Sequence, residues 1–371
     1  MADEDMLSWD ESIFRDEHVF EIDYVPEVFE HRDTQLETLT HALRPATRGS
    51  RPLNVLATGP PGTGKTTAVQ KVFGELDAQP GVRAVRVNGQ VDSTRYAVFS
   101  RIFRALFDYE PPASGISFKK LFGQIAEKLT EEETVLVVAL DDVNYLFYEN
   151  EASDTLYSLL RAHEAHPGTK IGVILVSSDL DLDLIEGLDS RVQSVFRPEE
   201  IYFPVYDVPE IVDILSHRIE VGFRPDVVPP DVLDAVAERT AKTGDLRVGI
   251  DLLRRAGLNA ERRASKTIEQ EDIEAAFETA RHVHLERHLA GLSDNERALL
   301  RVVAETDAEQ AGAVYEAFHE ETDLGYTRYT EIVNKLDDLG LIEAEYERLD
   351  GRGRSRSIRL AEDPETVREL L

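Results

Sequence analysis

The run Gly59-Pro-Pro-Gly-Thr-Gly-Lys-Thr66 constrains the fold most, because it matches the full pattern Gly-x4-Gly-Lys-Thr. An apolar run, 53–58, precedes it, and helical spacing from 66 to 76 follows it. In a strand–loop–helix of this kind, glycines let backbone N–H groups turn toward phosphate oxygens, and the helix N-terminus adds partial positive charge. We therefore predict a nucleotide site in which Lys65 contacts the β- and γ-phosphates and Thr66 binds Mg²⁺.

A pair of acids after another apolar run supplies the second half of this site. The run 135–140 is typical of a buried strand, and Asp141 and Asp142 follow it directly. A phosphate loop needs such an acid to hold the magnesium shell, so we assign Asp141 to the metal and Asp142 to polarising the attacking water. The alternative is a pair of carboxylates that only ends a strand.

Strand-like and helical runs alternate through the first half of the chain. The strand-like runs are 53–58, 82–87, 135–140 and 171–176. This alternation predicts a parallel sheet covered by helices on both faces. After Pro204 the spacing is helical, in 208–221, 230–240, 246–265 and 271–288. From Leu292 on, helices precede two short strand-like runs, 341–346 and 357–360, which predict the hairpin of a winged helix.

Composition limits the partners and the surroundings. The 371 residues hold 72 acids, 41 bases and no cysteine, for a net charge of −31. The lack of cysteine excludes disulfide scaffolds, cysteine nucleophiles and zinc ribbons. Such acidity normally argues against nucleic-acid binding, but in molar salt the Debye length is about 3 Å and a partner hardly senses the global charge. We favour a halophilic source over an acidic mesophilic one.

The ends of the chain carry no targeting signal that we recognise. The N-terminus MADEDMLSWDE is acidic where a signal peptide is basic and then apolar. No apolar run approaches the roughly 18–20 residues of a membrane span. We predict a cytoplasmic, nucleoid-associated protein with no membrane partner.

The order of the motifs GPPGTGKT, LDDVNYL, ILVSSDLDL, LDSRV and GDLR resembles that of an AAA+ ATPase. Three further segments, 20–35, 244–261 and 325–360, resemble archaeal replication initiators of the origin recognition complex/cell division control type. The P-loop alone is shared by many NTPases, whereas this order of motifs is much more specific. The resemblance covers about residues 18–361. It implies an α/β P-loop AAA+ core with a parallel sheet, an all-α lid and a C-terminal winged helix.

The resemblance also implies domain bounds. They are an acidic flexible N-terminus at 1–18, the AAA+ nucleotide-binding domain at 19–205, the helical lid at 206–285 and the winged-helix DNA-binding domain at 286–371. The expected ligands are ATP or ADP with Mg²⁺, bound between the core and the lid.

By the same resemblance, further residues take roles around the nucleotide. Those expected to touch it are Val25, Pro26, Gly62, Thr63, Gly64, Lys65, Thr66, Thr67, Tyr206, Arg218 and Arg247. Ser178 would orient the hydrolytic water, Arg247 would read the γ-phosphate, and Arg191 would reach the γ-phosphate of a neighbouring subunit. The alternatives are a solvated Arg247 paired with Asp245, a surface Arg191, and, for Tyr206 and Arg218, a core tyrosine and a surface arginine.

Two departures from the family pattern predict slow hydrolysis. Asp142 stands where many relatives have Glu, and Ser178 where most have Asn. Asp is one methylene shorter than Glu, and a misplacement of roughly 1 Å can cost on the order of 10²-fold in rate. We therefore expect ATP to act more as a conformational switch than as a motor fuel.

Two arginine-rich segments are candidates for DNA contact. The segment 93–107 holds Arg95, Arg101 and Arg104 and no acid, on a helix whose aromatic stripe is typical of a buried face. The resemblance implies a DNA-contacting helical insertion there. The tip 351–359 holds Arg352, Arg354, Arg356 and a fourth arginine and again no acid; the alternative is a solvated turn. In the helix ahead of it, the candidates for major-groove contact are Thr327, Arg328, Tyr329 and Lys335.

The predicted function is an ATP-dependent DNA replication initiator that binds double-stranded origin DNA and helps to load the replicative helicase. On DNA it would meet further copies of itself or a paralogue. Two alternatives stay open: a winged-helix DNA regulator that uses ATP only as a ligand, and an AAA+ regulator of signalling or transposition.

Overall fold

The computed structural model describes residues 12–371 except 22, 112–115, 181, 291, 307–309, 339–340, 349–353, 362–363, 365–366 and 369–370. Within helices and strands, the side chains of 280–288, 290, 338, 345–348 and 354–355 also lie outside the description. The chain divides into two compact units, Met1–Ile273 and Glu274–Leu371. None of the described helices has the length and apolar character needed to cross a membrane.

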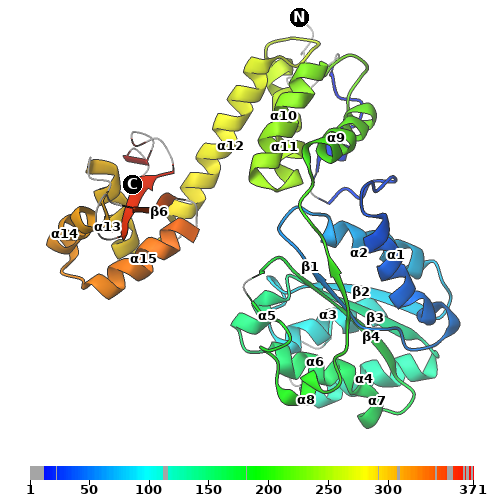
Figure 1. Cartoon of the computed structure of the whole chain (residues 1–371). Coiled ribbons are helices and arrows are strands. Elements are labelled where there is room, and N and C mark those ends of the chain that lie inside the picture. Colours follow the sequence, from blue (N-terminus) through cyan, green and yellow to red (C-terminus); the bar gives the residue numbers. More distant parts are fainter. Residues whose placement is uncertain are drawn as a thin grey trace, which may run out of the picture. The chain divides into compact units, whose positions relative to one another are not determined.

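A five-stranded parallel sheet forms the centre of the first unit (Figure 1). Its strands are β1 (Val55–Thr58), β2 (Val82–Asn88), β3 (Val135–Asp141), β4 (Lys170–Ser177) and β5 (Glu199–Tyr202). They lie in the order β2-β3-β4-β1-β5, and every pairing is parallel. The predicted sheet is confirmed, with β5 as an edge strand that the sequence reading did not include.

Helices cover both faces of this sheet, because successive side chains of each strand point to opposite faces. In β3, Val135, Val137 and Ala139 join a core with α1 (Asp33–Leu43) and α2 (Lys65–Asp77). The alternate residues Leu136, Val138 and Leu140 join the opposite core. That core includes α3 (Arg95–Phe107), α4 (Phe118–Glu131) and α6 (Ala152–Leu160). Short helical turns complete the two layers: η2 (Arg44–Arg48) joins the core of α1 and α2, and the turns that join the opposite core are α5 (Asn144–Tyr148), α7 (Ala162–Ala165) and α8 (Ser190–Gln193).

A bundle of helices follows β5 in the first unit. Its helices are α9 (Val208–Gly222), α10 (Pro230–Thr243) and α11 (Leu246–Arg262), and they confirm the helical runs predicted after Pro204. Asp207 caps α9 in a capping box with Glu210, and Gly244 ends α10 in the left-handed conformation.

Residues 12–20, which include η1 (Glu17–Phe20), pack on this bundle as an arm. Ile13, Phe14, Val19 and Phe20 are buried, and the ring of Phe14 stacks on that of Phe223 at 4.8 Å. The prediction of a flexible segment at 1–18 is therefore wrong for residues 12–18, because apolar side chains anchor them; residues 1–11 lie outside the description.

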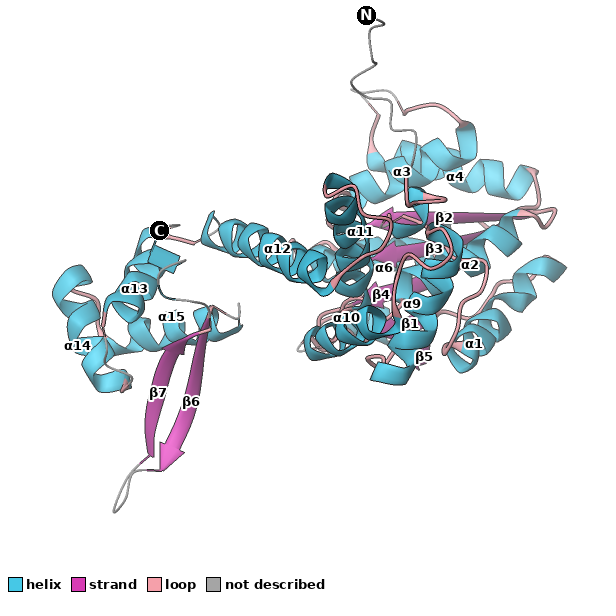
Figure 2. Cartoon of the chain, turned by 90° about the horizontal axis from the view of Figure 1, so that it is seen from above, coloured by secondary structure: helices cyan, strands magenta, loops and turns pink. Residues whose placement is uncertain are grey.

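The second unit contains the predicted helices and hairpin. It includes the end of α12 (Gln270–Ala290), then α13 (Asp294–Glu305), α14 (Ala311–Thr322) and α15 (Tyr326–Asp338). The antiparallel strands β6 (Ile342–Arg348) and β7 (Arg354–Leu360) follow and form the hairpin seen beside α15 in Figure 2. Leu299, Phe318 and Leu336 lie in its core. This element order is the one predicted for a winged helix.

Candidate nucleotide site and DNA-contacting elements

Three glycines give the loop between β1 and α2 its shape. Gly59, Gly62 and Gly64 have φ angles of +148°, +68° and +90°. A Cβ at these positions would overlap Phe203, Asp245 and the pair Phe29–Tyr206, respectively. Because Gly64 is the N-cap of α2, no side chain caps the first-turn N–H groups. The loop therefore offers backbone donors and a helix N-terminus to an anion, which fits a nucleotide phosphate.

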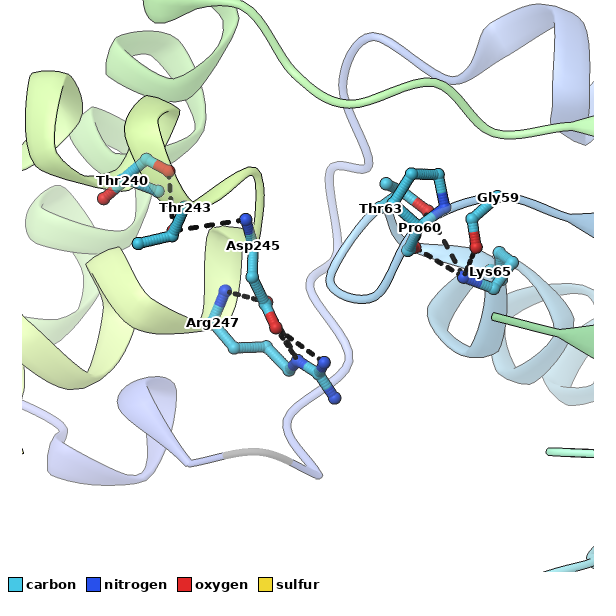
Figure 3. A network of polar contacts seen from close by, with 8 residues as sticks. All are labelled: Gly59, Pro60, Thr63, Lys65, Thr240, Thr243, Asp245 and Arg247. Carbon is cyan, nitrogen blue, oxygen red and sulfur yellow. Dashed lines mark hydrogen bonds and ion pairs between the residues drawn. The ribbon is translucent and has the colours of Figure 1, made fainter. Parts of the chain in front are cut away.

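Lys65 lies folded over this loop. Its Nζ donates to the carbonyl oxygens of Gly59 and Pro60, each at 2.6 Å, as drawn in Figure 3. The side chain is buried, and burial lowers the pKa of Lys65 to about 8, with the charge of Arg247 acting in the same direction. Burial and a lowered pKa are both expected of an amine held in a site that phosphate oxygens would otherwise fill.

The predicted metal ligands meet at the end of β3. Thr66 Oγ1 donates to Asp141 Oδ1 at 3.2 Å, and Arg86 Nη1 lies 3.3 Å from Asp141 Oδ2. Burial, and next the charge of Asp142, raise the pKa of Asp141. A hydroxyl beside a carboxylate is an oxygen donor set that suits Mg²⁺. Asp142 follows in the left-handed region, at φ +52°, and is half-buried.

The lid contributes Arg247 from the start of α11. Asp245 is the N-cap of this helix: its Oδ1 accepts from the backbone N–H of Arg247 at 2.9 Å. The same carboxylate binds the Arg247 guanidinium, with Nη2–Oδ2 at 2.6 Å (Figure 3). The hydrogen bonds with Asp245 raise the pKa of Arg247. Asp245 also lies against Gly62, so the start of α11 touches the phosphate loop.

A buried arginine, Arg32, joins the loop to Tyr206. Its Nε donates to the carbonyl of Thr63 at 3.0 Å, and its guanidinium lies 3.6 Å from the centre of the Tyr206 ring. Burial raises the pKa of Tyr206 to about 12, so this phenol stays protonated beside Gly64. The sequence reading named Tyr206 but missed Arg32, although Arg32 lies within the family segment 20–35.

The other residues predicted around the base lie in the segment that follows the arm and on α9. Pro26 is buried and Val25 is exposed. Arg218 is buried; its guanidinium donates to the carbonyl of Val19 and lies 4.5 Å from the Tyr24 ring. It is therefore not a surface arginine. It contacts the segment that leads into Val25 and Pro26.

Ser178 and Arg191, predicted to act in hydrolysis, differ in their surroundings. Ser178 directly follows β4 and is half-buried. Arg191 is exposed; it pairs with Asp189, lies 3.7 Å from Asp154 and 5.1 Å from the Tyr157 ring. These contacts hold Arg191 at the surface, where a neighbouring subunit would find it.

Two of the three arginines of α3 have acidic neighbours in the structure that the sequence segment does not contain. Arg95 lies 4.2 Å from the Phe118 ring and 3.7 Å from Asp154, and Arg104 pairs with Glu110 at 2.7 Å. Arg101 is exposed. The segment itself holds no acid, but Asp154 and Glu110 from outside it lie beside Arg95 and Arg104; DNA contact by these arginines stays a prediction.

Two residues predicted to contact DNA make contacts within the second unit itself. Tyr329 is buried and its hydroxyl donates to the carbonyl of Ala311, whereas Tyr326, one turn earlier on α15, is 57% exposed. Arg356 folds back onto Asn334 and Asp337, which ties β7 to α15.

The remaining candidates of this unit are exposed or lie outside the described residues. Thr327 and Arg328 are exposed, and Arg328 pairs with Glu331 at 2.6 Å. Lys335 pairs with Glu296. Arg352 lies outside the described residues, as does the side chain of Arg354.

Comparison with known proteins decides the family. An AAA ATPase domain model matches residues 28–176, and a Cdc6 AAA+ ATPase-type lid domain model matches 212–278. ORC1-type DNA replication protein 6 of Halobacterium salinarum is 70% identical over 369 residues, which cover 100% of this chain and 99% of the relative. The chain belongs to the ORC1-type DNA replication proteins. It is therefore an AAA+ ATPase with a nucleotide-binding core, as the motif order predicted.

Two further comparisons support this ORC1-type assignment. ORC1-type DNA replication protein 2 of Methanosarcina acetivorans is 53% identical over 372 residues, with 100% and 99% of the two chains covered. The structure of the Aeropyrum pernix ORC1 protein in complex with DNA superimposes with a TM-score of 0.79 at 28% identity, covering 98% and 97%. The Halobacterium relative also agrees with the halophilic character predicted from composition and with the archaeal origin that the resemblance implies.

Proposed function

We propose that this ORC1-type protein binds ATP with Mg²⁺, binds double-stranded origin DNA in that state, and helps to recruit the replicative helicase. The observation that carries the proposal is the convergence of Lys65, the Thr66–Asp141 pair and Asp245, which binds Arg247, on one phosphate loop. The printed description of the Aeropyrum relative as a complex with DNA supports the second part.

In this proposal, different residues of the site bind the phosphates, hold the metal and activate the attacking water. Lys65 and the loop N–H groups hold the phosphates, and Thr66 and Asp141 would hold the metal. Mg²⁺ bound by these two residues would neutralise negative charge on the phosphates. Asp142 orients and polarises the attacking water, and Ser178 is placed after β4 to orient the same water. Because Asp142 is short and half-buried, we infer slow turnover, with ATP occupancy serving as a switch.

Arg191 gives this switch a dependence on neighbours. It is exposed and held by Asp189, so its guanidinium is available to the γ-phosphate of a second copy or a paralogue. An arginine supplied in this way accelerates phosphoryl transfer by about 10³–10⁵-fold. We infer that hydrolysis rises when copies assemble side by side on DNA.

The N-terminal end of α15 is the DNA-reading element that we favour. Tyr326, Thr327 and Arg328 are exposed there, and a helix N-terminus also favours phosphate oxygens. Arg101 of α3 offers a second contact from the first unit.

Footprinting across the DNA that flanks the protein's own gene tests this function, with purified protein in molar KCl. We expect a discrete footprint with ATP and Mg²⁺ that weakens with ADP and is lost with Lys65→Ala. A footprint that is identical with and without nucleotide would contradict the ATP dependence, whereas absence of ATP turnover in the presence of DNA would favour the regulator that uses ATP only as a ligand. Binding without sequence preference would contradict the origin-binding role.

A further inference from the structure

The carboxylate of Asp245 lies against the loop that we expect to bind the phosphates of the nucleotide. Asp245 Oδ1 lies so close to Gly62 that a Cβ on this glycine would overlap it. Gly62 belongs to the loop whose backbone donors and helix N-terminus attract phosphate oxygens. A lid residue therefore brings a negative charge onto the phosphate loop itself.

This carboxylate also binds the guanidinium of the lid residue Arg247 in a bidentate manner. Arg247 Nε lies 3.0 Å from Asp245 Oδ1, and Arg247 Nη2 lies 2.6 Å from Oδ2. Such a fork is the geometry in which a guanidinium binds a carboxylate or a phosphate equally well. The Arg247 side chain is 55% exposed and Asp245 23%, so the guanidinium can turn without disturbing a packed core.

The backbone contact of Asp245 is separable from its charge. Asp245 Oδ1 also accepts from the N–H of Arg247 and so caps α11. Asparagine and serine serve as N-caps about as well as aspartate, within a few tenths of a kcal/mol. Removing only the charge therefore leaves the start of α11 in place.

We propose that Asp245 is a positioning residue that competes with the terminal phosphate of ATP for the guanidinium of Arg247. When ATP binds, Arg247 exchanges its carboxylate partner for the γ-phosphate, while Asp245 keeps its cap on α11. The exchange makes lid engagement specific for the triphosphate, because the phosphates of ADP end short of the position that Arg247 reads. The inference rests on ATP binding at the loop and adds a device that sets the preference for ATP over ADP.

Calorimetric titration with ATP–Mg²⁺ and with ADP–Mg²⁺, in molar KCl, tests this exchange. We expect Asp245→Asn to bind ATP about tenfold more tightly, a change of about 1.4 kcal/mol, because the γ-phosphate then no longer competes with a carboxylate for Arg247. The affinity of the same variant for ADP should change by less than about twofold. Asp245→Ser should repeat the result if the Asn variant folds poorly. Asp251→Asn is the matched control, because Asp251 holds Arg255 on the same helix at 2.6 Å and should change neither affinity.

A double-mutant cycle with Arg247→Ala separates the exchange from simple repulsion. We expect Asp245→Asn to give no gain in the Arg247→Ala background. An equal gain there would overturn the proposal, because the carboxylate would then act on the phosphates directly. Weaker or unchanged ATP binding by Asp245→Asn would also overturn it, since Asp245 would then orient Arg247 rather than compete for it. Failure of the unaltered protein to bind ATP would contradict the proposed function instead.

Discussion

Lys65 shows how a single buried charge makes nucleotide binding depend on pH. Its pKa is lowered from 10.5 to about 8, chiefly by burial. A base with a depressed folded pKa destabilises the fold below pH 8, and this cost is relieved as the pH rises toward 10.5. Phosphate binding has the opposite dependence, because phosphates bind the protonated amine.

We therefore predict that ATP binding weakens above pH 8. One unit above a pKa of about 8, some nine-tenths of the free protein has a neutral Lys65, so the apparent Kd should rise about tenfold between pH 7 and pH 9. Fluorescence or calorimetric titration at constant free Mg²⁺ measures this. Lys65→Arg keeps its charge over the whole range, so its Kd should be higher but flat. A Kd of the unaltered protein that does not change up to pH 9 would contradict the lowered pKa.

Asp142 permits a clean test of water activation. Its backbone has φ +52°, a region that Asn adopts as readily as Asp, so Asp142→Asn should keep the local structure. We expect turnover to fall by at least about 10²-fold, the usual contribution of a general base, while ATP affinity stays near that of the unaltered protein. Phosphate release and equilibrium binding check the two parts. Unchanged turnover would remove Asp142 from this role.

Among the elements, the arm of residues 12–20 is the least expected. Phe14 is 7% exposed and stacks on Phe223, and Gly257 has no room for a Cβ because of these two rings. We predict that Phe14→Ala lowers the free energy of unfolding of the first unit by about 3 kcal/mol, within the range for buried Phe→Ala changes. Denaturant unfolding in molar KCl measures it. Phe14→Leu, which keeps most of the buried surface, should lose less; equal losses would indicate a backbone effect.

The elements also show what the sequence can predict. The loop, α2 and the Asp141 strand were predictable because their signals are local: glycine spacing, helical periodicity and an unbroken apolar run. The edge strand β5 was missed because its sequence is EEIY and only Ile201 is buried, so it lacks an apolar run. The arm was missed because acids surround its few apolar residues.

Contacts between residues far apart in the sequence were the other feature that the sequence could not predict. Arg86 reaches Asp141 from the neighbouring strand, and Asp154 reaches both Arg95 and Arg191, contacts that no local count of charges contains. Tyr329 and Tyr326 differ by one turn of α15, and which of the two faces the core follows from how α14 packs. A match to family motifs locates such residues but does not orient them.

For the whole molecule, the net charge of −31 determines how DNA can be held. Counterion release drives most protein–DNA association, yet it nearly vanishes when bulk salt is already molar. Affinity then rests on short-range contacts: arginine to phosphate or base edges, stacking, and fit to groove shape. The exposed side chains at the start of α15 are available for such contacts, whereas Arg356 is engaged within its own unit.

We predict origin-DNA binding that persists in molar KCl, falls only weakly as salt is raised further, and depends on Tyr326 and Arg328. Each substitution to Ala should cost about 1–3 kcal/mol if the side chain contacts a base. Arg301→Ala is the matched control, because Arg301 pairs with Glu321 at the surface of the same unit much as Arg328 pairs with Glu331. Fluorescence anisotropy with duplex DNA across a KCl series measures both effects, and ATP affinity should not change in any of the three variants. Binding that disappears above ~0.3 M KCl would show that long-range attraction dominates after all. Equal losses in Arg328→Ala and Arg301→Ala would show that the start of α15 does not read the DNA.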